Sequence, residues 1–243
     1  MTSVPPVVRD LADRLDGLGW VSDLLVAGSL ATRDYVPGVS DLDLVALTEG
    51  PVGAARQEML TGLHRELDRG AARGLDLGCV YVDAGRLADL GALHPTWTHG
   101  SLIQRSLSGV TRAELVRHGF AVLGRPSAAV LPEMTDDDVR RAARAELCGY
   151  WAHAARRPLW WLNPVIADLG LTSMARGRHA LETGQLLTKT EAIERAHAPA
   201  WLKDQLRARR QGHPVTSPRA LTALIAWRDA RRTVAGASRR APA

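Results

Sequence analysis

The first half of the chain alternates between segments with helical and with strand-like hydrophobic spacing. Residues 5–18 carry apolar side chains three to four positions apart, which predicts an amphipathic helix. A further helix is predicted over residues 52–72 by leucines on one side. Short apolar or alternating runs predict strands over residues 24–27, 41–47, 75–82 and 120–123. The pattern therefore predicts a small mixed sheet with helices.

The second half of the chain has helical spacing throughout. Thr135, followed by three aspartates, is typical of a helix start, because a hydroxyl caps the first turn and carboxylates favour the positive end of the helix dipole. Asn163-Pro164 and Ser217-Pro218 predict two more helix starts, and Gly184 predicts the end of the earlier of these two helices. One apolar face recurs every four residues, at Val139, Ala143, Leu147 and Trp151.

These two patterns divide the chain. We expect an α+β domain over residues 1–130 and an all-α helical bundle over residues 131–243. The small, basic tail from Ala235 onward is expected to fray. A length of 243 residues is enough for two compact domains.

Composition places the chain among soluble globular proteins. Hydrophobic residues make up 46% and charged residues 23%, which argues against intrinsic disorder. Two cysteines argue against a disulfide framework, and neither a signal peptide nor an apolar run of about 20 residues is visible. We therefore expect a cytoplasmic protein with no membrane segment.

Charge is unevenly distributed along the chain. Residues 1–130 carry a net charge of −3 and the remainder +8, which together give the overall +5. This asymmetry would suit a site that holds metal on one side and phosphate on the other. The basic half has no stripe of interleaved aromatic residues, so we do not expect a nucleic-acid partner.

The segment with the most chemical content joins Gly28-Ser29 to Ser40-Asp41-Leu42-Asp43. Two carboxylates separated by one residue on a strand point to the same face, where they repel unless a cation holds them. A Gly-Ser turn after a buried strand offers backbone N–H groups to an anion. Since Mg²⁺ prefers carboxylates together with phosphate oxygens, the segment predicts a phosphate and magnesium site. The alternative is a solvated turn followed by an acidic strand edge.

This segment resembles the signature of the nucleotidyltransferase superfamily related to DNA polymerase β, with ten residues between Ser29 and Ser40. The resemblance implies that Asp41 and Asp43 are catalytic and ligate two Mg²⁺ ions. It also implies that Gly28, Ser29 and Ser40 belong to the nucleotide site.

The superfamily needs a third carboxylate from a later strand of the same sheet. Asp76 is the carboxylate that lies inside the predicted strand 75–82, so the resemblance implies that Asp76 is a third metal ligand and a catalytic residue. The family usually has glutamate at that place, and the shorter aspartate side chain changes the reach of a general base to an acceptor hydroxyl. The alternative is that Asp76 faces water on an edge strand.

Residues 174–192 are similar to the C-terminal helical domain of aminoglycoside (3″)(9) adenylyltransferases. The resemblance implies that Arg176 and Lys189 hold the phosphates of ATP. Independently, Thr188 and Glu191 fit a capping box that puts Lys189 at the first helical position, where a cation is disfavoured unless an anion binds. The alternative is an exposed lysine that starts a helix.

The same resemblance implies two acceptor-binding residues. Trp97 lies near the place of the family's substrate-stacking tryptophan, and Asp168 lies near its substrate-binding aspartate, although both matches need gaps. The alternatives are core packing for Trp97 and a solvated helix face for Asp168.

Together these features imply transfer of AMP from ATP, with Mg²⁺, to a hydroxyl of a small acceptor by a monomer or weak dimer. An aminoglycoside such as streptomycin or spectinomycin is one acceptor, with antibiotic resistance as the consequence. A neutral or anionic acceptor stays open, because a half with net charge +8 suits a polycation poorly. Two alternatives are an adenylyltransferase acting on a protein or tRNA-like partner and a non-catalytic nucleotide-binding relative.

Overall fold

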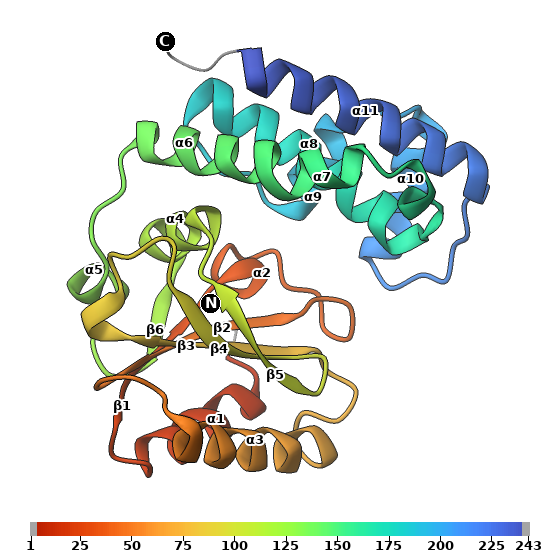
Figure 1. Ribbon diagram of the computed structural model, residues 1–243. Coiled ribbons are helices and arrows are strands. Elements are labelled where there is room, and N and C mark those ends of the chain that lie inside the picture. The colour runs from red at the N-terminus through yellow and green to blue at the C-terminus, as the bar shows by residue number, and fades with distance from the viewer. Residues whose placement is uncertain (1–3, 240–243) are drawn as a thin grey trace. The chain divides into compact units, whose positions relative to one another are not determined.

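A computed structural model describes residues 4–239, and the chain forms two compact units, Met1–Glu133 and Met134–Ala243. The first unit contains a six-stranded sheet with helices, and the second is built from helices (Figure 1). The expected fold class, an α+β part followed by a helical bundle, is confirmed. Among the described helices, none is long and apolar enough to span a bilayer.

The sheet of the first unit is mixed, as predicted. Its strand order is β5-β4-β3-β2-β1-β6, and β2 and β3 run parallel while all other neighbouring strands are antiparallel. The strands are β1 (Val21–Val26), β2 (Leu42–Thr48), β3 (Leu77–Asp83), β4 (Leu93–Thr98), β5 (Ser101–Ser106) and β6 (Phe120–Leu123).

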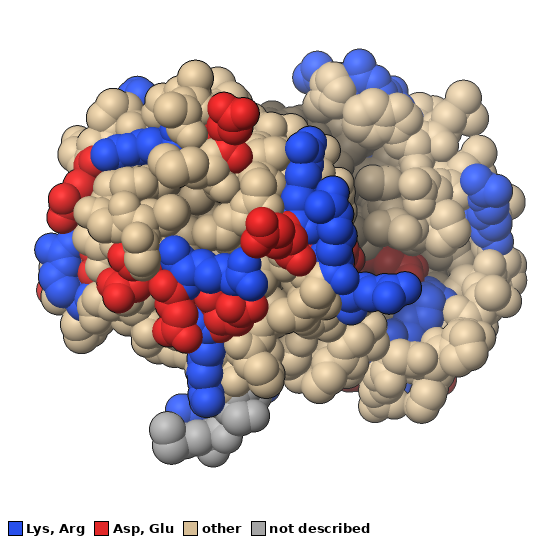
Figure 2. Space-filling view, turned by 90° about the horizontal axis from the view of Figure 1, so that it is seen from below, with Lys and Arg blue, Asp and Glu red and all other residues tan. Residues whose placement is uncertain are grey.

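Alternation along the central strands gives this sheet two apolar faces. One face, which includes Leu44 of β2, packs against helices α1 (Pro6–Asp16) and α3 (Ala54–Arg69). The opposite face, which includes Val45, packs against α4 (Gly109–His118). Figure 1 shows α1 and α3 beneath the sheet and α4 above it. Viewed from the α1 and α3 side, acidic and basic side chains are interspersed and not gathered by sign (Figure 2).

The hairpin of β4 and β5 was not predicted from the sequence. Its hydrophobic alternation is weak, because Pro95 interrupts β4 and most of β5 is exposed. The two strands are joined through His99 and Gly100, which both have positive φ angles. Three short elements complete the first unit: α2 (Gly28–Ala31), η1 (Ala84–Arg86) and α5 (Ser127–Val130).

The helical unit begins and ends its main helices at the predicted caps. Thr135 forms a capping box with Asp138, and the Asn163 side chain accepts a hydrogen bond from the Val165 amide. Gly184 ends a helix in the left-handed conformation. The elements are α6 (Asp136–Glu146), η2 (Leu147–Trp151), α7 (Ala152–Ala155), η3 (Pro158–Leu162), α8 (Pro164–Thr183), α9 (Lys189–Arg195), α10 (Ala200–Arg210) and α11 (Arg219–Arg239).

The last helix departs from the sequence-based expectation of a frayed tail. The segment from Ala235 to Arg239 continues α11, and Ala237 is buried in the core of the helical unit. Small residues such as Ala226 and Ala230 face this core, which lets α11 lie close to α8. Residues 240–243 lie outside the described residues.

An ion pair between a buried aspartate and an exposed arginine joins β1 to the segment that follows β6. Asp23 of β1 is fully buried, and the Arg125 side chain donates to both of its carboxylate oxygens, at 3.1 and 2.7 Å. The Arg125 amide and the Ser22 hydroxyl donate to the same carboxylate. Burial alone would raise the pKa of Asp23, but the hydrogen bonds from Arg125 and Ser22 outweigh it and leave the pKa below its usual value.

We expect Asp23→Asn to destabilise the protein by about 1–3 kcal/mol at neutral pH, because buried donors lose a charged acceptor. The lowered pKa means that this stabilisation is present above the unfolded-state pKa and is lost as the pH falls through the folded-state pKa. Denaturant unfolding at pH 7 and in the acid range measures the difference. Asp10→Asn, which removes an exposed i,i+4 pair with Arg14, is the matched control and should cost under about 0.5 kcal/mol. A pH-independent difference would contradict this account.

Candidate functional site

The turn from β1 into α2 places Gly28 directly against Asp43. Gly28 has a φ of +59°, and a Cβ atom added there would lie 2.1 Å from the Asp43 Oδ2 atom. The Ala27 amide also donates to the Asp43 carbonyl at 2.8 Å. The two halves of the sequence motif therefore meet in space, and glycine is required where they meet. Ser29 is buried in the first turn of α2.

The acidic part of the motif lies at the start of β2. Asp43 is exposed between the buried Leu42 and Leu44, so its side chain points away from the core that these leucines enter. Asp41 is exposed one residue before the strand. Ser40 is buried, and its hydroxyl accepts a hydrogen bond from the Val36 amide at 2.9 Å, so Ser40 stabilises the preceding turn.

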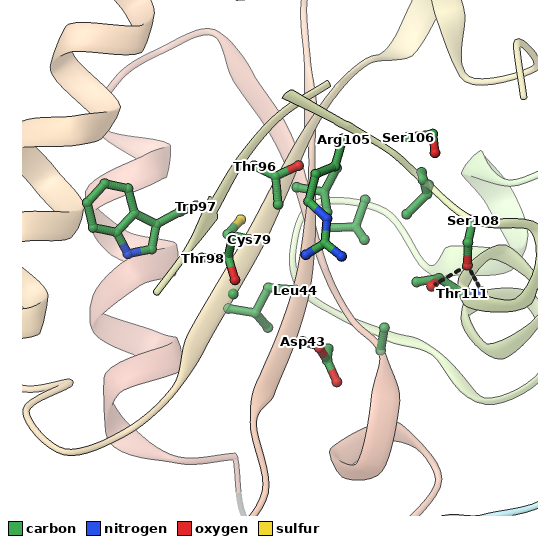
Figure 3. A pocket seen from close by; sticks show the side chains of 15 residues that line it. Asp43, Leu44, Cys79, Thr96, Trp97, Thr98, Arg105, Ser106, Ser108 and Thr111 are labelled. Atoms are coloured by element: carbon green, nitrogen blue, oxygen red, sulfur yellow. Dashed lines mark hydrogen bonds between the residues drawn. The ribbon is translucent and has the colours of Figure 1, made fainter. Parts of the chain in front are cut away.

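Asp43 lines a cavity of about 250 Å³, which we call the Asp43 pocket. Strands β2 to β5 form its floor, and the start of α4 forms one side. Figure 3 shows the Arg105 side chain extending from β5 into the middle of the lining residues. The polar side chains in the lining are Asp43, Thr96, Thr98, Arg105, Ser106, Ser108 and Thr111.

Asp76 does not line the Asp43 pocket. It lies one residue before β3, where its carbonyl accepts from the Leu42 amide at 2.8 Å, and it lines a second cavity with Asp68. Burial raises the pKa of Asp68, a hydrogen bond from Trp97 opposes that rise, and the charge of Asp76 adds to it. These contacts place Asp76 beside Asp68.

The neighbour of Asp43 on β3 is Gly78. In the parallel register of β2 and β3, Leu42 pairs with Leu77 and Asp43 pairs with Gly78. Within residues 4–239, no three His, Cys, Asp or Glu side chains are grouped so that they could hold a metal ion. Asp76 stands two positions before Gly78, beside the start of β2, and its expected role with Asp41 and Asp43 as a metal ligand stays a prediction.

Trp97 is a core residue, which corrects the expectation that its ring stacks on a substrate. Its side chain is 1% exposed and stacks on His64, with ring centroids 4.9 Å apart. Trp97 pairs with Cys79 in the sheet and shares its buried face. Burial lowers the pKa of His64 to about 3, so the ring against Trp97 is neutral.

In the helical unit, Arg176 and Lys189 approach the same loop. The Arg176 Nε atom donates to the Leu187 carbonyl at 2.9 Å, two residues before Lys189. The predicted capping box is present, and Lys189 occupies the first position of α9. Their expected contact with ATP phosphates stays a prediction.

Asp168 makes a bidentate ion pair in the helical unit. Its carboxylate accepts from Arg209 at 2.7 and 2.9 Å, and its side chain is about one quarter exposed. Asp168 is therefore committed to joining α8 to α10, and a cationic acceptor would have to displace Arg209 from it.

Arg105 and the hydroxyl groups around it were missed by the sequence analysis. The strand that carries Arg105 has little apolar alternation, so it gave no strand signal. The Ser108 side chain caps α4 by accepting from the Thr111 amide, and Ser108-Gly109 in the sequence is a helix-start signal that could have indicated this side of the pocket.

Several solved structures are similar to this chain, and one of them covers most of its length. It is a crystal structure of spectinomycin adenyltransferase AAD(9) from Enterococcus faecialis with ATP and spectinomycin. The likeness has a TM-score of 0.66 at 15% sequence identity and covers 92% of this chain and 97% of that one. No protein-family model and no curated protein sequence matches the chain. The comparison shows that this chain shares its fold with that adenyltransferase.

We expect Gly28→Ala to destabilise the protein more than Gly19→Ala does. Both glycines have positive φ angles, so both variants carry backbone strain of about 1–2 kcal/mol. A Cβ atom at residue 19 meets nothing within 4 Å, whereas at residue 28 it meets the Asp43 carboxylate. Denaturant unfolding compares the two variants, and a crystal structure of Gly28→Ala should show Asp43 displaced. Equal destabilisation with Asp43 in place would contradict the close approach.

Proposed function

We propose that the protein transfers AMP from ATP to a hydroxyl group of a small molecule. The observation that carries this proposal is the contact between the Gly28 turn and the Asp43 carboxylate at the edge of a cavity. That contact brings an anion-binding turn next to an acidic group, an arrangement suited to a triphosphate accompanied by a cation. The shared fold with an adenyltransferase crystallised with ATP supports the same reaction.

Backbone groups and basic side chains would hold the triphosphate. The N–H groups at the Gly28-Ser29 turn would donate to phosphate oxygens. Arg176 and Lys189, which lie close to each other around Leu187, would neutralise the pyrophosphate as it leaves. In this proposal the chain orients the α-phosphorus for in-line attack and balances the charge that develops on the leaving group.

Two carboxylates, and not three, would serve a Mg²⁺ ion. Asp43 and Asp41 are exposed at the start of β2, and Mg²⁺ completes its shell with phosphate oxygens and water. When bound, the ion would neutralise phosphate charge. The proposal gives Asp76 no metal role, because Asp76 lines a second cavity with Asp68 and no three metal-binding side chains are grouped within residues 4–239.

A non-catalytic nucleotide-binding protein is the second candidate. Gly78 favours it, because the strand position beside Asp43 carries no side chain that could accept a proton from a hydroxyl. The two candidates share the nucleotide site and differ in turnover. Acceptor-dependent release of pyrophosphate, tested with small hydroxyl compounds and with cell lysate, separates them. A labelled macromolecule in lysate without turnover of small compounds would favour a protein or RNA acceptor.

We expect Asp43→Asn to lower Mg²⁺-dependent pyrophosphate release by at least about 100-fold, because a group that organises transition-state charge is removed. Asp43 is exposed, so thermal unfolding of the variant should stay close to wild type. Asp76→Asn should keep turnover within about threefold of wild type, because Asp76 lies with Asp68 in the second cavity. Turnover retained in Asp43→Asn, or lost in Asp76→Asn alone, would contradict this assignment.

A further inference from the structure

Arg105 offers a charged group to the interior of the Asp43 pocket. It lies on β5, an edge strand of the sheet, and among the described residues it makes no hydrogen bond or ion pair. Arg125 and Arg209, in contrast, each donate to a carboxylate at least twice. The guanidinium in the pocket therefore keeps its donors for a ligand.

The surroundings of Arg105 also suit an anion. Thr98 supplies a hydroxyl group from β4 on one side of the guanidinium, while the Thr96 hydroxyl donates to the His94 carbonyl. Ser108 and Thr111, whose hydroxyl groups are hydrogen-bonded to each other, lie on the α4 side (Figure 3). The Ser108 cap occupies the Thr111 amide, while the earlier amides of the first turn have no partner within the helix. The dipole of this ten-residue helix adds positive potential at the same wall.

The Asp43 pocket has one carboxylate among its described lining residues. Among its described lining residues, Asp43 and Arg105 are the charged ones, and Gly78 supplies no carboxylate between them. A polycation would place positive charge against Arg105 and find one carboxylate, which the proposed function uses for the cation of the triphosphate. The charges of the described lining residues cancel, so the pocket lacks the net negative charge that an aminoglycoside requires.

The phosphate turn lies at one edge of the Asp43 pocket and Arg105 lies away from that edge. Asp43 contacts Gly28 on the side of β1, where Ala27 also lines the pocket. Gly78, Thr98 and Arg105 lie on the other side of Asp43, on β3, β4 and β5. A triphosphate held at the Gly28-Ser29 turn would leave the Arg105 side of Asp43 to the second substrate. From this arrangement, and resting on the proposed function, we infer that the acceptor is a small hydroxyl compound with an anionic group, phosphate or carboxylate, bound by Arg105.

A phosphate titration tests the anion site without requiring turnover. Inorganic phosphate, added at constant ionic strength to full-length ¹⁵N-labelled protein, should shift the Arg105 Nε–H signal and the amides of Ser108 and Thr111 with saturation. Arg105→Gln should weaken this binding by about tenfold or more, as expected for a lost charge-assisted hydrogen bond. Arg9→Gln, an exposed arginine on α1 at the opposite sheet face, makes the same charge change and should have no effect. Shifts that do not saturate, or that survive in Arg105→Gln, would overturn the anion site.

The same titration identifies the source of the anion. It is repeated with saturating α,β-methylene ATP and Mg²⁺. Phosphate binding that persists at Arg105 supports an acceptor site. Displacement of phosphate by the nucleotide would assign Arg105 to the triphosphate and overturn the acceptor assignment.

Three acceptors that share a glucose ring then test which substrate charge the enzyme prefers. Glucose 6-phosphate is negative, glucose is neutral and glucosamine is positive. Pyrophosphate release from ATP should be fastest with glucose 6-phosphate, and Arg105→Gln should slow the reaction of this acceptor most. Equal or faster turnover with glucosamine, unchanged in Arg105→Gln, would overturn the inference while leaving the proposed function intact. Saturable phosphate binding at Arg105, with no pyrophosphate release from these or other small hydroxyl compounds or from cell lysate, would keep the anion site and overturn the proposed function in favour of a non-catalytic nucleotide-binding protein.

Discussion

The close approach between Gly28 and the Asp43 carboxylate is the constraint on which the candidate site depends. A Cβ atom at residue 28 would lie 2.1 Å from Oδ2, and the glycine also adopts a φ of +59°. The hydrogen bond from the Ala27 amide to the Asp43 carbonyl fixes the same two segments at backbone level. Residue 28 therefore has to be glycine for two reasons, the lack of space for a Cβ atom and the positive φ angle. The Gly-Ser turn and Asp43, which are separate in the sequence, lie together on one surface.

Sheet register determines what else surrounds that surface. Because β2 and β3 are parallel with Asp43 opposite Gly78, the strand beside Asp43 contributes no side chain and the cavity extends toward β4 and β5. Arg105 occupies that extension, and Asp76 lies with Asp68 in a separate cavity. The site is therefore asymmetric in charge, with one carboxylate near the phosphate turn and one guanidinium away from it.

The elements that the sequence predicted are those whose signals are local. Alternating apolar residues identified β2 and β3, and the Thr135, Asn163 and Gly184 caps identified helix ends, since each cap depends on a few neighbouring residues. The Gly-Ser turn and the later aspartates also predicted one common site, and Gly28 lies against Asp43 in the structure.

What the sequence could not predict depends on pairing between distant segments. The residue that stands beside Asp43 is set by the register of β2 and β3, which places Gly78 there and Asp76 two positions earlier on the same strand edge. Trp97 is buried because its face of β4 packs against α3. Pro95 interrupts the strand pattern of β4, so the sequence did not indicate which face Trp97 is on. Arg105 lies on an exposed edge strand whose pattern resembles a loop.

A crystal structure with α,β-methylene ATP and Mn²⁺ in place of Mg²⁺ tests the central claim most directly. Anomalous scattering should place Mn²⁺ within about 2.2 Å of an Asp43 carboxylate oxygen, with phosphate oxygens of the nucleotide at the Gly28-Ser29 turn. A metal held between Asp68 and Asp76, or a nucleotide bound away from Gly28, would contradict the account.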